Sequence, residues 1–156
     1  MPTLLAIDVG LRTGLALYEH SGRLLWYRSR NFGNRTRLRA AVRQLLHDLR
    51  DIEWLILEGG GPIADIWIHE AERRAIGIRC IAAEQWRADL LYPRSRRNGT
   101  DAKEAAGSVA RRVIEWSAAA RPTSLRHDAA EAILIGLWGM VDVGWLRSLP
   151  PAVMRS

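Results

Sequence analysis

The stretch that most constrains the fold is "LLAIDVG" near the start of the chain, a short apolar run that ends in an acid. Leu4 to Ile7 are all apolar, which is typical of a strand buried on both faces of a sheet. Asp8 closes this run, at a position where an unpaired buried carboxylate would be costly. Asp8 therefore needs an interaction that offsets the cost of its charge.

Apolar runs and turn signals predict five strands, at residues 3–10, 13–19, 22–30, 53–61 and 78–86. Helical spacing of apolar residues predicts helices over 34–51, 63–77, 101–120 and 128–140. Asn34 or Thr36 is expected to cap the first helix, and Thr100 or Asp101 the third. Three successive strands followed by alternating helices and strands predict an α/β fold, a central mixed five-stranded sheet flanked by helices.

The length of 156 residues favours one domain, expected over residues 1–146, with 147–156 as a loose C-terminal tail. The single cysteine, Cys80, excludes an intramolecular disulfide and is expected to be a small core residue. No signal peptide is visible, and the longest apolar run, 132–141, is too short to cross a bilayer. We therefore expect a cytoplasmic protein with no membrane partner.

The chain is strongly basic, with a net charge of +6 and a pI near 10.6. Such a balance favours a polyanionic partner such as nucleic acid, although arginine-rich composition and solubility alone could also produce it. Among the 23 basic residues Lys103 is the only lysine. The segment "YPRSRRNGTD" reads as an exposed basic loop that contains Arg94, Arg96 and Arg97.

Three further acids accompany buried elements. Glu58 ends the run "WLILEGGG", while Asp128 and Glu131 in "HDAAEAILIGL" are three residues apart and share one helix face. Grouped carboxylates repel one another unless cations neutralise them, and Mg²⁺ prefers oxygen ligands. Taken singly, Asp8 could instead accept backbone N–H bonds in a turn, and Asp128 with Glu131 could form a helix capping box.

At this point the chain resembles the RuvC-type Holliday-junction resolvases of the RNase H-like nuclease superfamily. The resemblance rests on "LAIDVGLRTGLAL", "WLILEGGG", "TDAKEAA" and "HDAAEAILIG". It implies an RNase H-like fold, a homodimer of bacterial or phage origin, and cleavage of four-way or otherwise branched DNA by metal-activated water. Where the family has D-A-A-D, this chain has Glu131 as the last acid.

The resemblance also implies a role for individual residues. Two Mg²⁺ ions, replaceable by Mn²⁺, would be bound by Asp8, Glu58, Asp128 and Glu131, with no small organic cofactor. Lys103 would stabilise charge on the scissile phosphate, and His127 would orient water or approach a phosphate. DNA contacts are expected from Arg12, Arg94, Arg96, Arg97 and Lys103. An apolar probe of the junction is expected among Ile63, Ile66 and Trp67, although packing in the core or at the dimer interface is the favoured role for Trp67. The dimer interface is expected on residues 63–75.

Two other functions remain open at this stage. Relatives that process pre-ribosomal RNA share the first motif and a late acid but lack an acid at the position of Glu58. The stretch "EGGGPIADI" fits G-x-G-x-x-A, with Glu84 placed as a ribose-binding acid, which would indicate a nucleotide-binding enzyme. Against the latter, Glu58 would repel a phosphate, and the chain leaves little room for a substrate domain.

Overall fold

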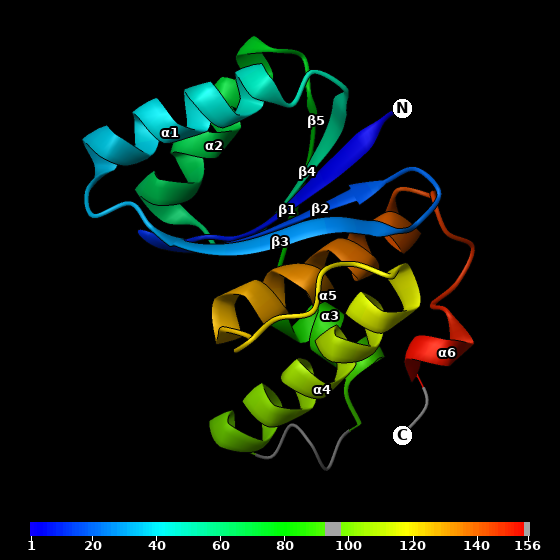
Figure 1. Cartoon of the computed structure of the whole chain (residues 1–156). Coiled ribbons are helices and arrows are strands. Elements are labelled where there is room, and N and C mark those ends of the chain that lie inside the picture. The colour runs from blue at the N-terminus through cyan, green and yellow to red at the C-terminus, as the bar shows by residue number, and fades with distance from the viewer. Residues whose placement is uncertain (93–97, 155–156) are drawn as a thin grey trace.

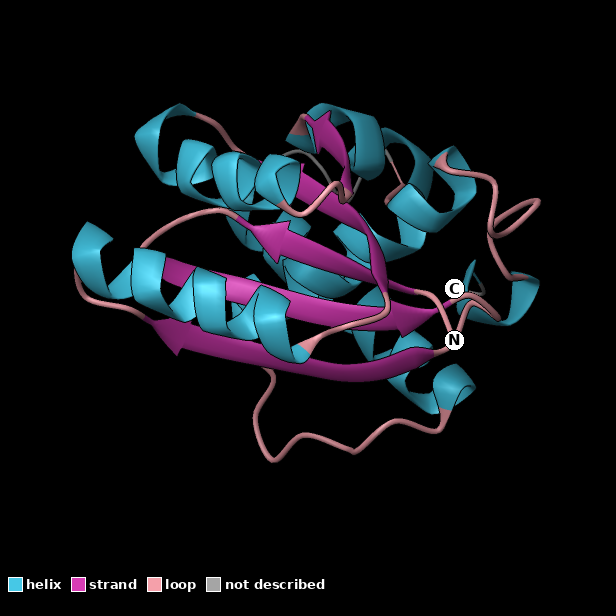
Figure 2. Cartoon of the chain, turned by 90° about the horizontal axis from the view of Figure 1, so that it is seen from above, coloured by secondary structure: helices cyan, strands magenta, loops and turns pink. Residues whose placement is uncertain are grey.

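The computed structural model describes residues 1–92 and 98–154, which form one five-stranded sheet with helices on both faces (Figures 1 and 2). The strand order is β3-β2-β1-β4-β5, with antiparallel pairing among β1, β2 and β3 and parallel pairing of β4 with β1 and β5. The strands are β1 (Thr3–Asp8), β2 (Arg12–Glu19), β3 (Leu24–Asn31), β4 (Ile52–Glu58) and β5 (Gly77–Ile81). The predicted mixed sheet is confirmed.

The helices divide between the two faces of the sheet (Figure 1). One face is covered by α1 (Arg35–Asp48) and α2 (Gly61–Arg73). The other is covered by α3 (Ala83–Leu90), α4 (Gly99–Ser117) and α5 (His127–Asp142). Each face has its own apolar core, as expected for a sheet buried on both sides. Within the described residues, no helix combines the length and apolar character needed to cross a bilayer.

Helix α5 is the most deeply buried helix, because its own residues are apolar on nearly every side of the helix. Glycines allow it to lie unusually close to the sheet. A Cβ on Gly136 would come within 2.4 Å of the Tyr18 ring, and one on Gly139 within 2.7 Å of Ile56. The hydroxyl of Tyr18 donates a 2.5 Å hydrogen bond to the carbonyl of Ile133. Helix α5 is therefore held in one position against β1, β2 and β4.

The largest difference from the sequence prediction lies after β5. The predicted strand over 78–86 ends at Ile81, and α3 follows, so Glu84 lies in the first turn of a helix and not at a strand end. The apolar run concealed a helical pattern, since Trp86 and Leu90 are four residues apart and both buried. The side chain of Gln85 accepts the backbone N–H of Ala82, which fixes the helix start.

Other predictions about helix ends are partly right. Asn34 caps α1 as expected, by accepting the N–H of Arg37. Helix α4 is capped by Asn98 and not by Thr100 or Asp101, because the Asn98 side chain accepts the N–H of Asp101.

The structure differs from two predictions about burial. Cys80 is exposed, contrary to the expected core position, because β5 is an edge strand. In the segment expected as a loose tail, Pro151–Met154 form α6, Val153 is fully buried, and its carbonyl accepts a hydrogen bond from Arg112 on α4.

The approach of α5 to β2 predicts a position that tolerates only glycine. A Cβ on Gly14 would lie 1.9 Å from the carbonyl oxygen of Asp128, which is backbone and cannot swing away. We expect Gly14→Ala to lower the free energy of unfolding by about 1–3 kcal/mol or more through overpacking.

Denaturant unfolding measures this effect, and Gly107→Ala provides the matched control. A Cβ on Gly107 in the middle of α4 would meet no heavy atom within 4 Å. The control should therefore be neutral or stabilising by roughly 0.5–1 kcal/mol, as for other helical Gly→Ala changes. Wild-type stability of Gly14→Ala would contradict the close packing of α5 on β2.

Candidate metal centre

Two of the predicted acids meet because of the register of the central strands. Asp8 is the last residue of β1 and Glu58 the last residue of β4. The two strands are parallel, and Asp8 pairs directly with Glu58. The apolar residues before each acid are fully buried, so both carboxylates emerge at the same end of the sheet interior. This arrangement confirms that the two strand-end acids lie side by side.

Helix α5 brings the third acid to this pair. Glu131 lies in the second turn of α5, and only 5% of its surface is exposed. The start of the helix is fixed by the contact of its backbone with Gly14 and by Ser29 on β3, whose hydroxyl donates a 2.8 Å hydrogen bond to Asp128. The sheet and the helix therefore set the position of Glu131 together.

Asp8, Glu58 and Glu131 form a compact carboxylate cluster. One oxygen from each lies within 4.8 Å of the others, and among residues 1–92 and 98–154 no other group of three potential metal ligands comes this close. All three donors are hard oxygen ligands of the kind that Mg²⁺ and Mn²⁺ prefer. The donor set therefore fits a divalent cation.

The cluster is electrostatically strained without a cation. The pKa of Asp8 is raised from 3.8 to about 8, first by burial and then by the negative charge of Glu131, the hydrogen bond to Glu58, and the charges of Glu58 and Asp128. Burial also raises the pKa of Glu58, although the hydrogen bond from Asp8 opposes this. Without a bound cation, Asp8 therefore keeps its proton at neutral pH and shares it with Glu58 through their hydrogen bond.

Two basic side chains already contact the cluster. Arg87 on α3 forms a 3.1 Å ion pair with Glu131, and Nε2 of His127 lies 2.7 Å from the same carboxylate oxygen. Arg87 also lowers the pKa of Glu58, and its buried Nε has no hydrogen-bond partner among the described residues. Sequence reasoning missed Arg87, because it treated the segment before it as a strand. The spacing of Trp86 and Leu90 was the signal that could have revealed this helix.

Asp128 lies beside the cluster and not within it. Its side chain accepts hydrogen bonds from Ser29 and from the backbone of Ala129, yet its charge contributes to the raised pKa of Asp8. The alternative role of Asp128 as a helix cap is wrong, because α5 begins at His127 and the capping position is Arg126.

The predicted cations are distributed differently. Arg12 is exposed at the start of β2 and, with Ser124, Arg126, His127 and Asp128, lines an open hollow of about 550 Å³ next to the carboxylates. Lys103 is exposed near the start of α4. The predicted contacts Arg94, Arg96 and Arg97 lie outside the described residues.

Of the residues considered as junction probes, Trp67 is fully buried in the core beneath α1 and α2, so it packs the interior. Ile63 and Ile66 on α2 are half-buried.

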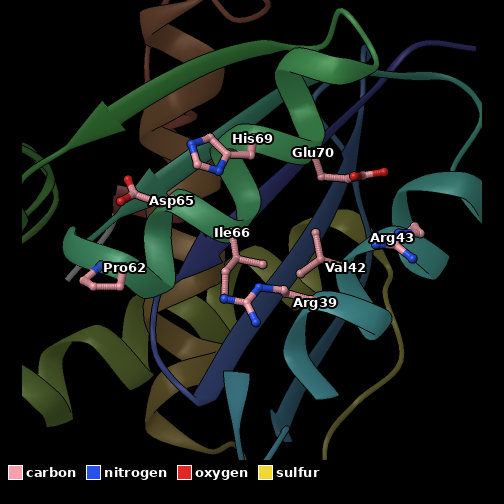
Figure 3. A pocket seen from close by; sticks show the side chains of 8 residues that line it. All are labelled: Arg39, Val42, Arg43, Pro62, Asp65, Ile66, His69 and Glu70. Carbon is pink, nitrogen blue, oxygen red and sulfur yellow. The ribbon is translucent and has the colours of Figure 1, made fainter. Parts of the chain in front are cut away.

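Another groove, of about 370 Å³, separates α1 from α2 (Figure 3). Figure 3 shows side chains from both helices around it: Arg39 and Arg43 come from α1, and Asp65, His69 and Glu70 come from α2. None of the predicted metal ligands lines this groove, and its charges are mixed. Its chemistry therefore does not single out an anion or a cation as ligand.

Comparisons with known proteins identify solved structures with the same fold. The structure superimposes on Thermus thermophilus RuvC in complex with a Holliday junction substrate, with a TM-score of 0.64 over 93% of this chain and 98% of that chain. The chain has the RuvC fold. A second Thermus thermophilus RuvC structure also gives 0.64, over 91% of this chain and 96% of that one.

The similarity to these RuvC structures is confined to the fold, since sequence identity is 18% and 19%. No protein-family model matches the sequence, and no curated protein matches it. The resemblance inferred from short motifs is thus confirmed by the three-dimensional superposition on RuvC.

The raised pKa of Asp8 predicts how stability depends on pH without metal. Between about 3.8 and about 8, Asp8 keeps its proton in the folded protein and loses it in the unfolded chain. Stability therefore falls as pH rises through this window. Asp8→Asn removes the titrating group. In EDTA, as pH rises from about 5 to about 9, the free energy of unfolding of the variant should therefore increase relative to that of wild type by at least about 1 kcal/mol.

Thermal unfolding measures the gain, which corresponds to about 2–4 °C per kcal/mol for a chain of this size. Asp65→Asn is the control, because Asp65 is exposed on α2 and lies outside the cluster. If wild type and Asp8→Asn keep a constant difference across this pH range, the inferred strain is absent.

Proposed function

We propose that this protein is a metal-dependent endonuclease that cuts four-way or otherwise branched DNA by hydrolysis. The observation that carries the proposal is the carboxylate cluster of Asp8, Glu58 and Glu131, built at one end of the RuvC fold. One of the similar structures is a RuvC bound to a Holliday junction, which supports branched DNA as the substrate class. The net charge of +6 fits a polyanionic partner.

In this proposal Asp8, Glu58 and Glu131 bind Mg²⁺ or Mn²⁺, and Asp128, held next to Asp8 by Ser29, completes a site for two ions. Bound divalent ions would activate water and neutralise charge on the scissile phosphate. Binding replaces the proton shared by Asp8 and Glu58, so affinity should increase as pH rises through the pKa of Asp8.

The surrounding side chains have distinct roles. Arg87 and His127 both contact Glu131, so they orient its carboxylate, and the charge of Arg87 limits the negative charge of the site. The hollow of Arg12 and Arg126 adjoins His127 and offers cationic contacts to phosphates of the bound strand. In this proposal Lys103 on α4 is the cation that approaches the scissile phosphate. Resolution of a four-way junction requires two cuts, which favours a homodimer with one centre in each subunit.

Cleavage of labelled nucleic acids tests the proposal. With Mg²⁺ or Mn²⁺, the protein should introduce paired nicks into a four-way junction and leave matched duplex DNA uncut. EDTA or Asp8→Asn should lower the rate by at least about a hundredfold, because loss of metal-based stabilisation costs several kcal/mol of barrier.

The control variant for cleavage is Glu53→Gln, which should cut like wild type because Glu53 is exposed near the start of β4, at the end of the strand away from Glu58. Binding of the junction by Asp8→Asn is measured in parallel, so that loss of cutting is separated from loss of binding. Cutting of an RNA/DNA hybrid in place of the junction would move the substrate to RNA. Unchanged cutting by Asp8→Asn would show that the cluster is not the catalytic centre.

A further inference from the structure

The outer edge of the sheet carries a set of arginines whose function the metal centre does not explain. Strand β3 is an edge strand, which in the described chain pairs only with β2. We define the β3 edge surface by Arg28 and Arg30 on β3, by Arg12 and Arg126 in the hollow beside the carboxylates, and by Arg37 in the first turn of α1. All five side chains are exposed.

The strand register places these charges on both sides of the edge. Arg28 pairs with Leu15, a core residue on the face covered by α1 and α2, so Arg28 and Arg30 project on that face. Ser29 projects on the opposite face, where it reaches Asp128 at the start of α5. Arg12 pairs with Asn31 and projects on the same face as Ser29. Near the carboxylate end of β3, cations therefore lie on both faces of the sheet: Arg28 and Arg30 on one face and Arg12 of β2 on the other.

These cations are not neutralised within the described part of the chain. None of the five arginines forms an ion pair there, although Arg73, Arg74, Arg79 and Arg87 all do. Arg28 stacks over the ring of Trp26 at 4.3 Å, which holds its guanidinium flat and leaves the N–H edges available. Helix α1 has no acidic residue in its first turn.

A shallow groove between β3 and α1 extends this surface. It holds about 200 Å³ and is lined by Arg28 and Arg30 on one side and by Gln44 and Asp48 on the other. Asp48 is the one acid in its lining and accepts a hydrogen bond from Gln44. In the groove between α1 and α2, by contrast, Arg39 and Arg43 stand opposite Asp65 and Glu70 (Figure 3). An excess of positive charge thus distinguishes the β3 side of α1.

The geometry points to the β3 edge surface as the docking surface for a duplex arm of the DNA substrate, a contact that rests on the proposed function. The surface begins in the hollow next to the carboxylates and continues along the edge. Arg28 to Arg30 span about 7 Å at about 3.3 Å per residue, which equals about two base pairs at 3.4 Å each. Arginine contacts to phosphates carry no sequence information, so the arm is bound by its backbone.

Salt-dependent binding of a four-way junction in EDTA tests this inference without cleavage. The variant Arg28→Gln/Arg30→Gln removes two charges from the edge. The control Arg50→Gln/Arg147→Gln removes two exposed arginines that precede β4 and follow α5, at the end of the sheet away from the carboxylates. Each lost phosphate contact lowers the slope of log affinity against log salt by about 0.9.

We expect the edge variant to bind at least about tenfold more weakly at low salt, with a slope smaller by about two, while the control matches wild type. Neutral methylphosphonate linkages placed within about five base pairs of the crossover should weaken binding by wild type and leave binding by the edge variant unchanged, because the phosphates they replace face the missing arginines. Circular dichroism and thermal unfolding confirm that both variants are folded.

The outcomes separate the two claims. If wild type fails to bind the junction, the proposed function fails. If wild type binds and cuts the junction but the edge variant shows the same affinity and salt slope, the β3 edge surface is not a DNA surface and its arginines serve only to keep the edge strand soluble. Equal losses in the edge and control variants would also overturn the inference, because they would reflect net charge alone.

Discussion

The close packing of α5 against the sheet is the constraint on which the rest of the structure depends. A helix this deeply buried contributes carboxylates to the interior only if its backbone lies near the strand ends, and Gly14, Gly136 and Gly139 remove the side chains that would hold it away. The hydrogen bonds from Tyr18 and Ser29 then fix its position along the sheet. The same contacts that bury the core therefore also determine where Glu131 lies.

That position creates an electrostatic conflict that a cation resolves. Burial and mutual repulsion raise the pKa of Asp8 to about 8, so Asp8 would hold a proton at neutral pH unless a cation supplied positive charge in its place. Arg87 and His127 relieve part of the conflict at Glu131 but leave the pair of Asp8 and Glu58 to share that proton. The carboxylate cluster thus lowers the stability of the fold, and binding of a divalent ion would restore that stability.

The sequence predicted those features that depend on strong local patterns. The buried runs before Asp8 and Glu58 indicated strands ending in acids, and the spacing of Asp128 and Glu131 indicated one helix face. It did not reveal α3, because the apolar run from Ile78 suits a strand and the helical pair of Trp86 and Leu90 lies beyond it. Arg87 was missed for that reason. Asp128, which lies outside the compact cluster, accepts a hydrogen bond from Ser29 on β3, a long-range contact that no local pattern encodes.

The most direct test of the central claim is anomalous X-ray diffraction from crystals soaked in Mn²⁺ at a pH above the pKa of Asp8. The account predicts an anomalous peak bounded by carboxylate oxygens of Asp8, Glu58 and Glu131, at about 2.0–2.2 Å from each ligand as expected for a hard divalent ion. The same crystals of Asp8→Asn should lack the peak or show it much weakened. If wild-type crystals soaked at a saturating Mn²⁺ concentration show no peak among these three carboxylates, the assignment of this cluster as a metal centre is contradicted.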